Sequence, residues 1–224
     1  MNTGVRVTAS SVYGLAVLGL LLFLPAGTLN YWQAWAFIVT FVAVTVFPTI
    51  YLARTNPAAL QRRMRAGPLA EGRTLQKVVM TGVFLALFAM VVFSAYDHRM
   101  GWSPVPDWVS LLGDALVAVG LGIAMLVVIQ NSYAAATVTV ESGQTLASGG
   151  VYRHVRHPMY VGTLVVVIGI PLALGSYWGL LFVIPNLAVI VFRILDEEKL
   201  LTQELAGYPE YTQRVRYRLM PYIW

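Results

Sequence analysis

Apolar residues fill this chain in long runs that a few polar and turn-forming residues interrupt. Four runs have the length of a helix that crosses a bilayer, which needs about 20 apolar residues. These runs are Ser11–Leu29, Trp32–Ala53, Val78–Tyr96 and Trp108–Gln130. Only Asn30 and Tyr31 separate the first two runs, so the pattern predicts a tight helical hairpin there.

The fifth run, Tyr160–Phe192, has 33 residues and is too long for one comfortable crossing. Pro171 and the glycines at Gly175–Gly179 interrupt it, which predicts a helical hairpin that returns the chain to its starting side. The predicted fold is an all-α integral membrane protein with six membrane segments and both termini inside. If the fifth run forms one tilted helix, the count falls to five and the N-terminus lies outside.

The regions between and after the runs carry weaker patterns. Thr137–Glu141 alternates like a short strand, and Asp97 and His98 are expected in a solvated loop after the third run. The tail Leu200–Trp224 is amphipathic, and Gly207 and Pro209 predict that it forms two short helices. We divide the chain into N-terminal transmembrane helices, 1–130, and a C-terminal catalytic region, 131–224.

Composition agrees with a membrane protein. Hydrophobic residues make up 58% of the chain and charged residues 11%, whereas soluble globular proteins are about 45–50% apolar and about 25% charged. The chain has no cysteine, which excludes disulfides and thiolate metal sites, and no other ligand spacing predicts a metal. The net charge of +5 is explained by basic residues that face anionic lipids, so no nucleic-acid partner is predicted.

The basic residues also predict an orientation. The link Arg54–Lys77 contains six cations and one acid, so the positive-inside rule places it in the cytoplasm with the C-terminal charged clusters. Ser11–Leu29 lacks the charged start and cleavage site of a signal peptide and is predicted to remain as a helix. The absence of cysteine and of a retention signal favours a multi-pass protein of a prokaryotic plasma membrane.

Two polar clusters flank the fifth run. Gly150–Gly162 contains two histidines, two arginines and a helix-starting proline, and Arg193–Glu198 contains one cation and three acids. Ionisable groups at the rim of a bilayer are costly, which makes them functional candidates. By itself Arg193–Glu198 also fits a helix end with an ordinary ion pair. The predicted hairpin, however, returns both clusters to one side, so we interpret them as halves of one site.

The residue types indicate the ligand. Pro158 starts a helix, and the N-terminus of a helix favours an anion. The carboxylates of Glu197 and Glu198 favour an ammonium group or ribose hydroxyls instead. A ligand that carries both a carboxylate and an ammonium group fits such a site, and S-adenosylmethionine is one, with an adenine that tyrosine or histidine can stack against.

The motif Gly150-x-Tyr152-x-x-x-Arg156-His157-Pro158-x-Tyr160-x-Gly162, followed by Glu197-Glu198, resembles the signature of the isoprenylcysteine carboxyl methyltransferase family. Phospholipid methyltransferases share a similar motif, and the resemblance covers roughly Asn131–Trp224. It implies an S-adenosylmethionine-dependent integral membrane methyltransferase that releases S-adenosylhomocysteine. The implied acceptor is lipophilic or small, such as an isoprenoid or prenylcysteine-like carboxylate or a lipid.

Matching positions carry the implied roles onto this chain. The residues implied to bind the cofactor are Tyr152, His157, Pro158, Tyr160, Gly162, Glu197 and Glu198. Arg193 and Glu197 are the catalytic candidates, and Arg193, one turn before the acids, is expected to meet the nucleophile or carboxylate of the acceptor.

Two other functions remain open from the sequence. A membrane reductase that uses NADPH on sterol or enone lipids would have a similarly compact multi-span fold, but it needs a basic pocket for the 2′-phosphate, and the paired glutamates oppose one. A non-catalytic lipid-binding membrane protein is the third reading.

Overall fold

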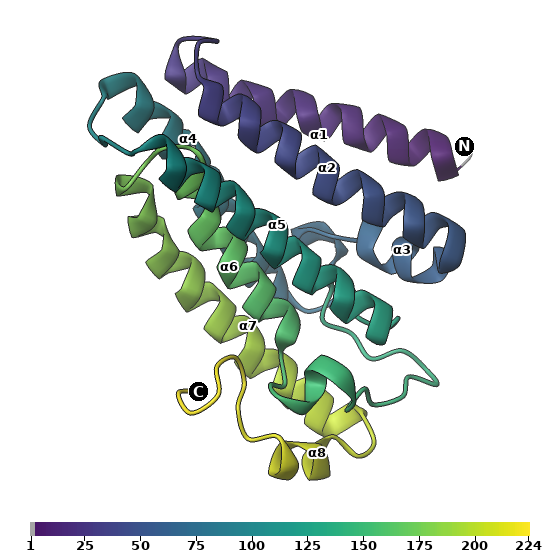
Figure 1. Cartoon of the computed structure of the whole chain (residues 1–224). Coiled ribbons are helices and arrows are strands. Elements are labelled where there is room, and N and C mark those ends of the chain that lie inside the picture. Colours follow the sequence, from purple (N-terminus) through teal and green to yellow (C-terminus); the bar gives the residue numbers. More distant parts are fainter. Residues whose placement is uncertain (1–2) are drawn as a thin grey trace.

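The computed structural model describes residues 3–224, and side chains from residue 12 onward. This part of the chain is helical and contains no strand, which confirms the all-α prediction (Figure 1). The helices are α1 (Thr3–Ala26), α2 (Trp32–Thr55), α3 (Pro57–Met64), α4 (Thr74–Met100), α5 (Asp107–Gln130), α6 (Pro158–Ala173), α7 (Val183–Glu204) and α8 (Tyr208–Arg214). Three short 3₁₀ turns, η1 (Pro68–Ala70), η2 (Gly150–Arg153) and η3 (Trp178–Phe182), join them.

Four helical stretches are long and apolar enough to cross a membrane. They are Trp32–Thr55, Thr74–Met100, Asp107–Gln130 and Trp178–Glu204, and α6 and the Val12–Ala26 part of α1 are shorter apolar helices. The described residues therefore hold six apolar helical segments. The fifth run does fold back: α6 ends at Ala173, Gly175 adopts a left-handed conformation with φ of 67°, and η3 leads into α7.

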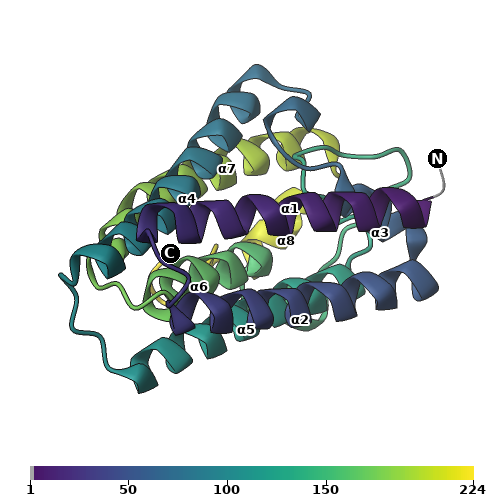
Figure 2. The ribbon, with the colours of Figure 1, turned by 90° about the horizontal axis from the view of Figure 1, so that it is seen from above.

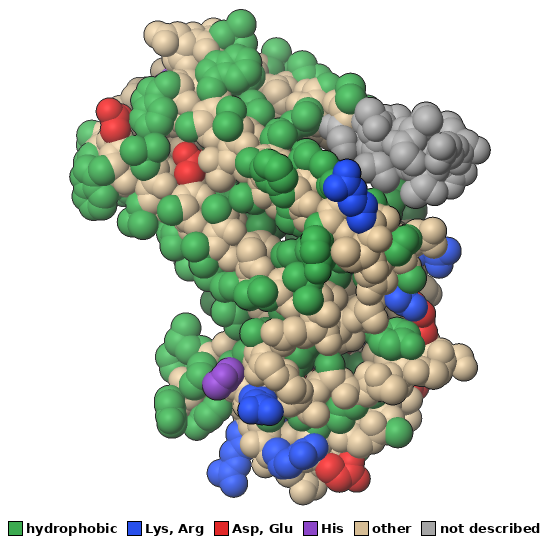
Figure 3. Space-filling view, turned by 45° about the vertical axis from the view of Figure 1, so that its right-hand side comes forward, with side chains coloured by type: hydrophobic (Ala, Val, Ile, Leu, Met, Phe, Trp, Pro, Cys, Tyr) green, Lys and Arg blue, Asp and Glu red, His purple; other side chains and the backbone are tan. Residues whose placement is uncertain are grey.

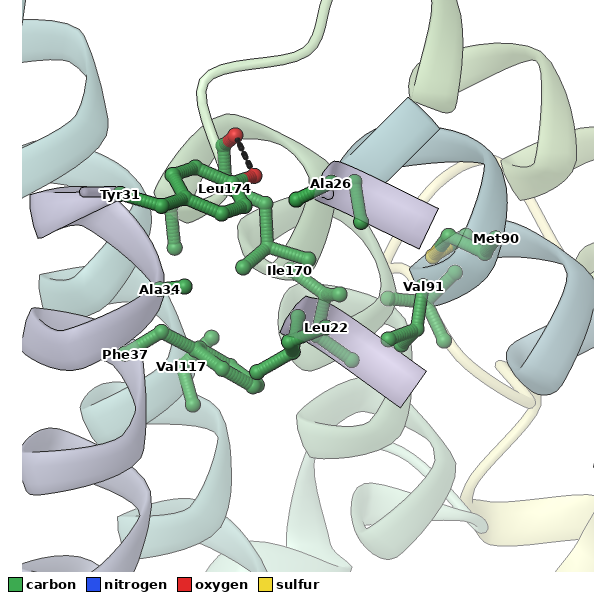
Figure 4. Packing of buried hydrophobic residues seen from close by; sticks show 13 residues of the cluster. Leu22, Ala26, Tyr31, Ala34, Phe37, Met90, Val91, Val117, Ile170 and Leu174 are labelled. Atoms are coloured by element: carbon green, nitrogen blue, oxygen red, sulfur yellow. Dashed lines mark hydrogen bonds between the residues drawn. The ribbon is translucent and has the colours of Figure 1, made fainter. Parts of the chain in front are cut away.

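The helices pack in pairs. Helices α5 and α6 lie side by side along most of α6, while α1 packs against α4 and α2 against α5 (Figures 1 and 2). A buried cluster joins α1, α2, α4, α5 and α6, and Figure 4 shows Leu22, Phe37 and Ile170 pointing toward its centre. The Tyr31 hydroxyl donates to the carbonyl oxygen of Leu174 at 2.5 Å, so it ties the α1–α2 turn to the α6–α7 turn.

Three local predictions are wrong. Thr137–Glu141 is an irregular segment, and the amide of Val138 donates to the side chain of Glu71 rather than to a neighbouring strand. The tail does break at Gly207, as predicted, but its first helical part is the end of α7, which runs on to Glu204, so only α8 is a separate short helix. Helix α4 extends to Met100, so Asp97 is buried and accepts from Ser103 and Ser176, and the ring of His98 stacks on Tyr31 at 3.7 Å.

Glycines set the distance between α5 and α6. A Cβ atom added to Gly120 would lie 2.5 Å from the carbonyl oxygen of Gly162, and one added to Gly169 would lie 2.8 Å from that of Gly113. Both helices repeat glycine after seven residues, and small residues at such spacing let membrane helices approach backbone to backbone. This contact fixes the start of α6, where the histidine–proline cluster lies.

Substituting Gly120 with leucine should therefore destabilise the protein. The added side chain must displace the backbone of α6, and overpacking of this kind costs about 1–3 kcal/mol. Thermal unfolding in detergent measures the loss. Gly122 is the matched control, because it lies on the same helix with nothing within 4 Å of an added Cβ atom. Equal unfolding temperatures for Gly120→Leu and Gly122→Leu would contradict the packing role.

Candidate functional site

A cavity of about 110 Å³ lies where the two polar clusters meet. The segment from Asn131 to Ala147 covers it, the start of α6 and the last turns of α7 form its walls, and Tyr208 and Tyr211 of the tail close it. Charged side chains gather toward the lower end and right-hand edge of the face in Figure 3, whereas its upper part is mainly hydrophobic.

The hairpin brings Tyr160 and Glu197 into direct contact across the cavity. The hydroxyl of Tyr160, on the first turn of α6, donates to Glu197 Oε2 at 2.6 Å. The same oxygen of Tyr160 accepts from Arg193 Nε at 3.0 Å. The clusters that lie about thirty residues apart in the sequence thus form one connected arrangement, in which Tyr160 is the bridge.

Arg193 is buried, and its guanidinium makes four hydrogen bonds within the protein. Nη1 donates to Glu71 Oε1 and to Gln76 Oε1, both at 2.8 Å, and Nη2 donates to the carbonyl oxygen of Ala136 at 2.7 Å. Glu71 and Gln76 are themselves buried. Arg193 therefore connects α7 to α4, to the segment before α4 and to the segment Asn131–Ala147 that covers the cavity. Its side chain also lines the cavity.

Glu198 points away from the cavity, although it follows Glu197 in sequence. Its carboxylate accepts from Arg218 Nε at 2.8 Å and lies 3.2 Å from His157 Nε2. Arg156 Nε lies 2.9 Å from the same carboxylate as an ion pair, without hydrogen-bond alignment. Glu198 thus links α7 to the histidine–proline corner and to the tail.

Tyr152 lies on η2 and faces the cavity. Asn131 Nδ2 donates to its hydroxyl at 3.1 Å, and the hydroxyl of Tyr211 donates to its carbonyl oxygen at 2.7 Å. Burial raises the pKa of the Tyr152 phenol; Asn131 opposes this shift, and the charge of Glu197 adds to it. The phenol therefore keeps its proton at neutral pH and stays a hydrogen-bond donor.

Arg62 of α3 holds the segment that covers the cavity. Its Nε and Nη2 donate to the two oxygens of Glu141 at 2.7 and 2.8 Å, and its guanidinium lies 4.7 Å from the ring centre of Tyr133. Sequence reasoning assigned the Arg54–Lys77 link to topology and lipid contact and missed Arg62 and Glu71. Glu71 had a visible signal, because it is the single acid among six cations.

Six of the candidate residues line the cavity, namely Tyr152, His157, Pro158, Tyr160, Arg193 and Glu197. Two do not. Gly162 faces the backbone of α5, and Glu198 faces the tail. In the part of the chain that the structure describes, no group of acids and histidines is arranged to hold a metal ion.

Comparison with known proteins gives the site a context. Residues 108–207 match the model of the phospholipid methyltransferase family, which confirms the resemblance to membrane methyltransferases and extends it into α5. Over 91 residues, 39% of this chain, the sequence is 31% identical to Delta(14)-sterol reductase TM7SF2 of Mus musculus. The match covers 22% of that reductase, so the chain spans about a fifth of its length.

A solved structure is also similar in outline. The eukaryotic intramembrane Ras methyltransferase ICMT, isoprenylcysteine carboxyl methyltransferase, aligns over 100% of this chain and 88% of its own with 19% sequence identity and a TM-score of 0.45.

Proposed function

We propose that this protein is a membrane methyltransferase that uses S-adenosylmethionine to methylate a lipophilic or small acceptor. One observation carries the proposal: Glu197 presents a carboxylate to the cavity, and the cations around it are paired with other acids. Arg193 pairs with Glu71, and Arg156 pairs with Glu198. The cavity therefore favours a ligand with positive charge.

The residues present fit such a cofactor. Among the described side chains, only Tyr160 donates to the Glu197 carboxylate, and it uses Oε2, so Oε1 is free to accept from an ammonium group or a ribose hydroxyl. Tyr133, Tyr152, Tyr208 and Tyr211 line the cavity and supply aromatic faces for an adenine or for a cation. When bound, S-adenosylmethionine supplies a methyl group on a positively charged sulfur.

The contribution of the chain is positioning. Tyr160 orients Glu197 by its hydrogen bond, and Arg193 holds the Tyr160 hydroxyl in place. The cover segment and the tail limit the access of water. Holding two reactants in a reactive geometry lowers a barrier by about 7–11 kcal/mol in favourable cases. In this proposal Arg193 acts through Tyr160 rather than on the acceptor, because four of its five N–H donors already bond to the protein.

The partial match to a sterol reductase is the observation that favours the reductase as an alternative function. A reductase that binds NADPH needs cations free to bind the 2′-phosphate. The two arginines of the cavity, Arg156 and Arg193, already face carboxylates, and Glu197 would repel a phosphate. These charges favour the methyltransferase over the reductase.

The orientation belongs to the same proposal. The cavity lies at the end of the bundle that carries the Arg54–Lys77 link, and the positive-inside rule puts that end in the cytoplasm. The polar cofactor is then supplied from the cytoplasm of a prokaryotic cell, and a lipophilic acceptor from the membrane.

Ligand binding to the purified full-length protein in detergent tests the function. We expect S-adenosylmethionine and S-adenosylhomocysteine to bind one per chain in calorimetry, and NADPH to release no heat and to leave their binding unchanged. Competition between NADPH and S-adenosylhomocysteine would indicate the reductase. Absence of binding by all three would indicate a non-catalytic lipid-binding protein.

A further inference from the structure

A second hollow lies on the side of α5 that faces α2 and α3. It has a volume of about 160 Å³ and is lined by Val44, Thr45, Pro48, Thr49, Leu52, Leu60, Arg63, Leu121, Ala124, Met125 and Val128. The hydroxyls of Thr45 and Thr49 bond to backbone carbonyls of α2, so their methyl groups remain to line the hollow. Apart from Arg63, this groove is therefore apolar.

Arg63 lies at one end of the groove without an acidic partner. Its Nη1 donates to the sulfur of Met159 at 3.1 Å, and no carboxylate among the described residues lies within ion-pair distance of it. The adjacent Arg62 is paired with Glu141. Burial lowers the pKa of Arg63, as expected for a cation held partly out of water without compensation. Its guanidinium keeps donors free for an anion.

The groove has the position and length to take a lipid chain. It is formed by the C-terminal halves of α2 and α5, which are both long and apolar enough to cross a membrane. Val44 and Leu52 are about 12 Å apart along the axis of α2, at about 1.5 Å per residue. Arg63 follows on α3 just beyond the end of α2, where the headgroups of a bilayer lie.

From this geometry we propose that the groove binds one hydrocarbon chain of an anionic phospholipid, whose phosphate accepts hydrogen bonds from Arg63. Guanidinium groups bind phosphate oxygens in pairs, and the apolar walls match the chain. The lipid is a resident ligand of the membrane protein and is distinct from the methyl acceptor. Met159 borders both the Arg63 guanidinium and the cavity, so the phosphate lies one side chain away from the proposed cofactor site.

Native mass spectrometry of the delipidated protein tests this inference. The probes are dioleoyl phosphatidylglycerol and dioleoylglycerol, which has the same chains without the phosphate. We expect one phosphatidylglycerol to bind at least about tenfold more tightly than dioleoylglycerol, since a charge-assisted hydrogen bond is worth that much. Arg63→Gln should remove the difference, whereas Arg65→Gln, the same change at an exposed arginine two residues on, should keep it.

A second pair of variants tests the groove itself. Val44→Trp fills it and should reduce binding of the same phosphatidylglycerol about tenfold, whereas Val46→Trp, at a position that is 40% exposed and outside the groove, should not. Equal binding of the two lipids, or equal effects within either pair, would overturn the inference. Binding of S-adenosylhomocysteine is measured on every variant, so a failure of the proposed function is recognised separately from a failure of the lipid site.

Discussion

Replacing Arg193 with methionine should lower the free energy of unfolding by about 3–5 kcal/mol, the range found when one partner of a buried ion pair is removed. Glu71 is 3% exposed and Gln76 is fully buried, so both lose a donor that water cannot replace. The carbonyl oxygen of Ala136 loses its partner as well. The unfolding temperature in detergent and the size-exclusion profile measure this loss.

Two further variants distinguish the loss of the buried Arg193–Glu71 ion pair from the loss of a positive charge in general. Arg216→Met removes a cation from an exposed position and should unfold at the temperature of the unchanged protein. Arg193→Met combined with Glu71→Gln should recover part of the loss, because the uncompensated charge is gone while an amide oxygen can still accept from Val138. If Arg193→Met alone were as stable as Arg216→Met, the buried contacts of Arg193 would not stabilise the fold as we infer.

Replacing Glu197 with glutamine should weaken the binding of S-adenosylmethionine at least about tenfold and leave the unfolding temperature unchanged. The glutamine keeps an acceptor for Tyr160 but removes the negative charge that the cavity offers, and a hydrogen bond to a charged group is worth about 1.5–3 kcal/mol. Titration calorimetry measures the affinity, and thermal unfolding measures the integrity of the fold.

Glu198→Gln is the natural comparison, since it makes the same change one residue further along α7. Arg156, His157 and Arg218 share that carboxylate, so this variant should unfold at a lower temperature. We propose that Glu197 binds the cofactor and that Glu198 stabilises the fold. Normal cofactor binding by Glu197→Gln, or equal instability of the two variants, would contradict this assignment.

The membrane helices and the hairpin could be predicted because their signals are local. Apolar length marks the crossings, and Pro171 with Gly175 marks the fold-back. Once the chain returns, the meeting of Tyr160 with Glu197 follows from the topology. The motif at Gly150–Gly162 then indicated a membrane methyltransferase, and the family comparison agrees with that class.

The remaining features depend on contacts that no local pattern encodes. Arg193 is bonded to Glu71 and Gln76, which precede it by more than a hundred residues. Glu197 and Glu198 differ by about 100° around α7, and the sequence does not tell which one faces the cavity. Gly162 was assigned to the pocket by motif position, although its seven-residue spacing to Gly169 was a readable sign of helix packing.

The close approach of α5 and α6 restricts how this molecule can move. Helices whose backbones touch cannot slide or rotate past one another without collision, so this pair behaves as a rigid wall. We therefore expect exchange of a polar ligand to require displacement of the irregular segment Asn131–Ala147, which Arg62 on α3 holds at Glu141 and which Arg193 and Glu71 hold at Ala136 and Val138. In the proposed methyltransferase, ligand exchange would then depend on movement of that segment rather than on rearrangement of the membrane helices.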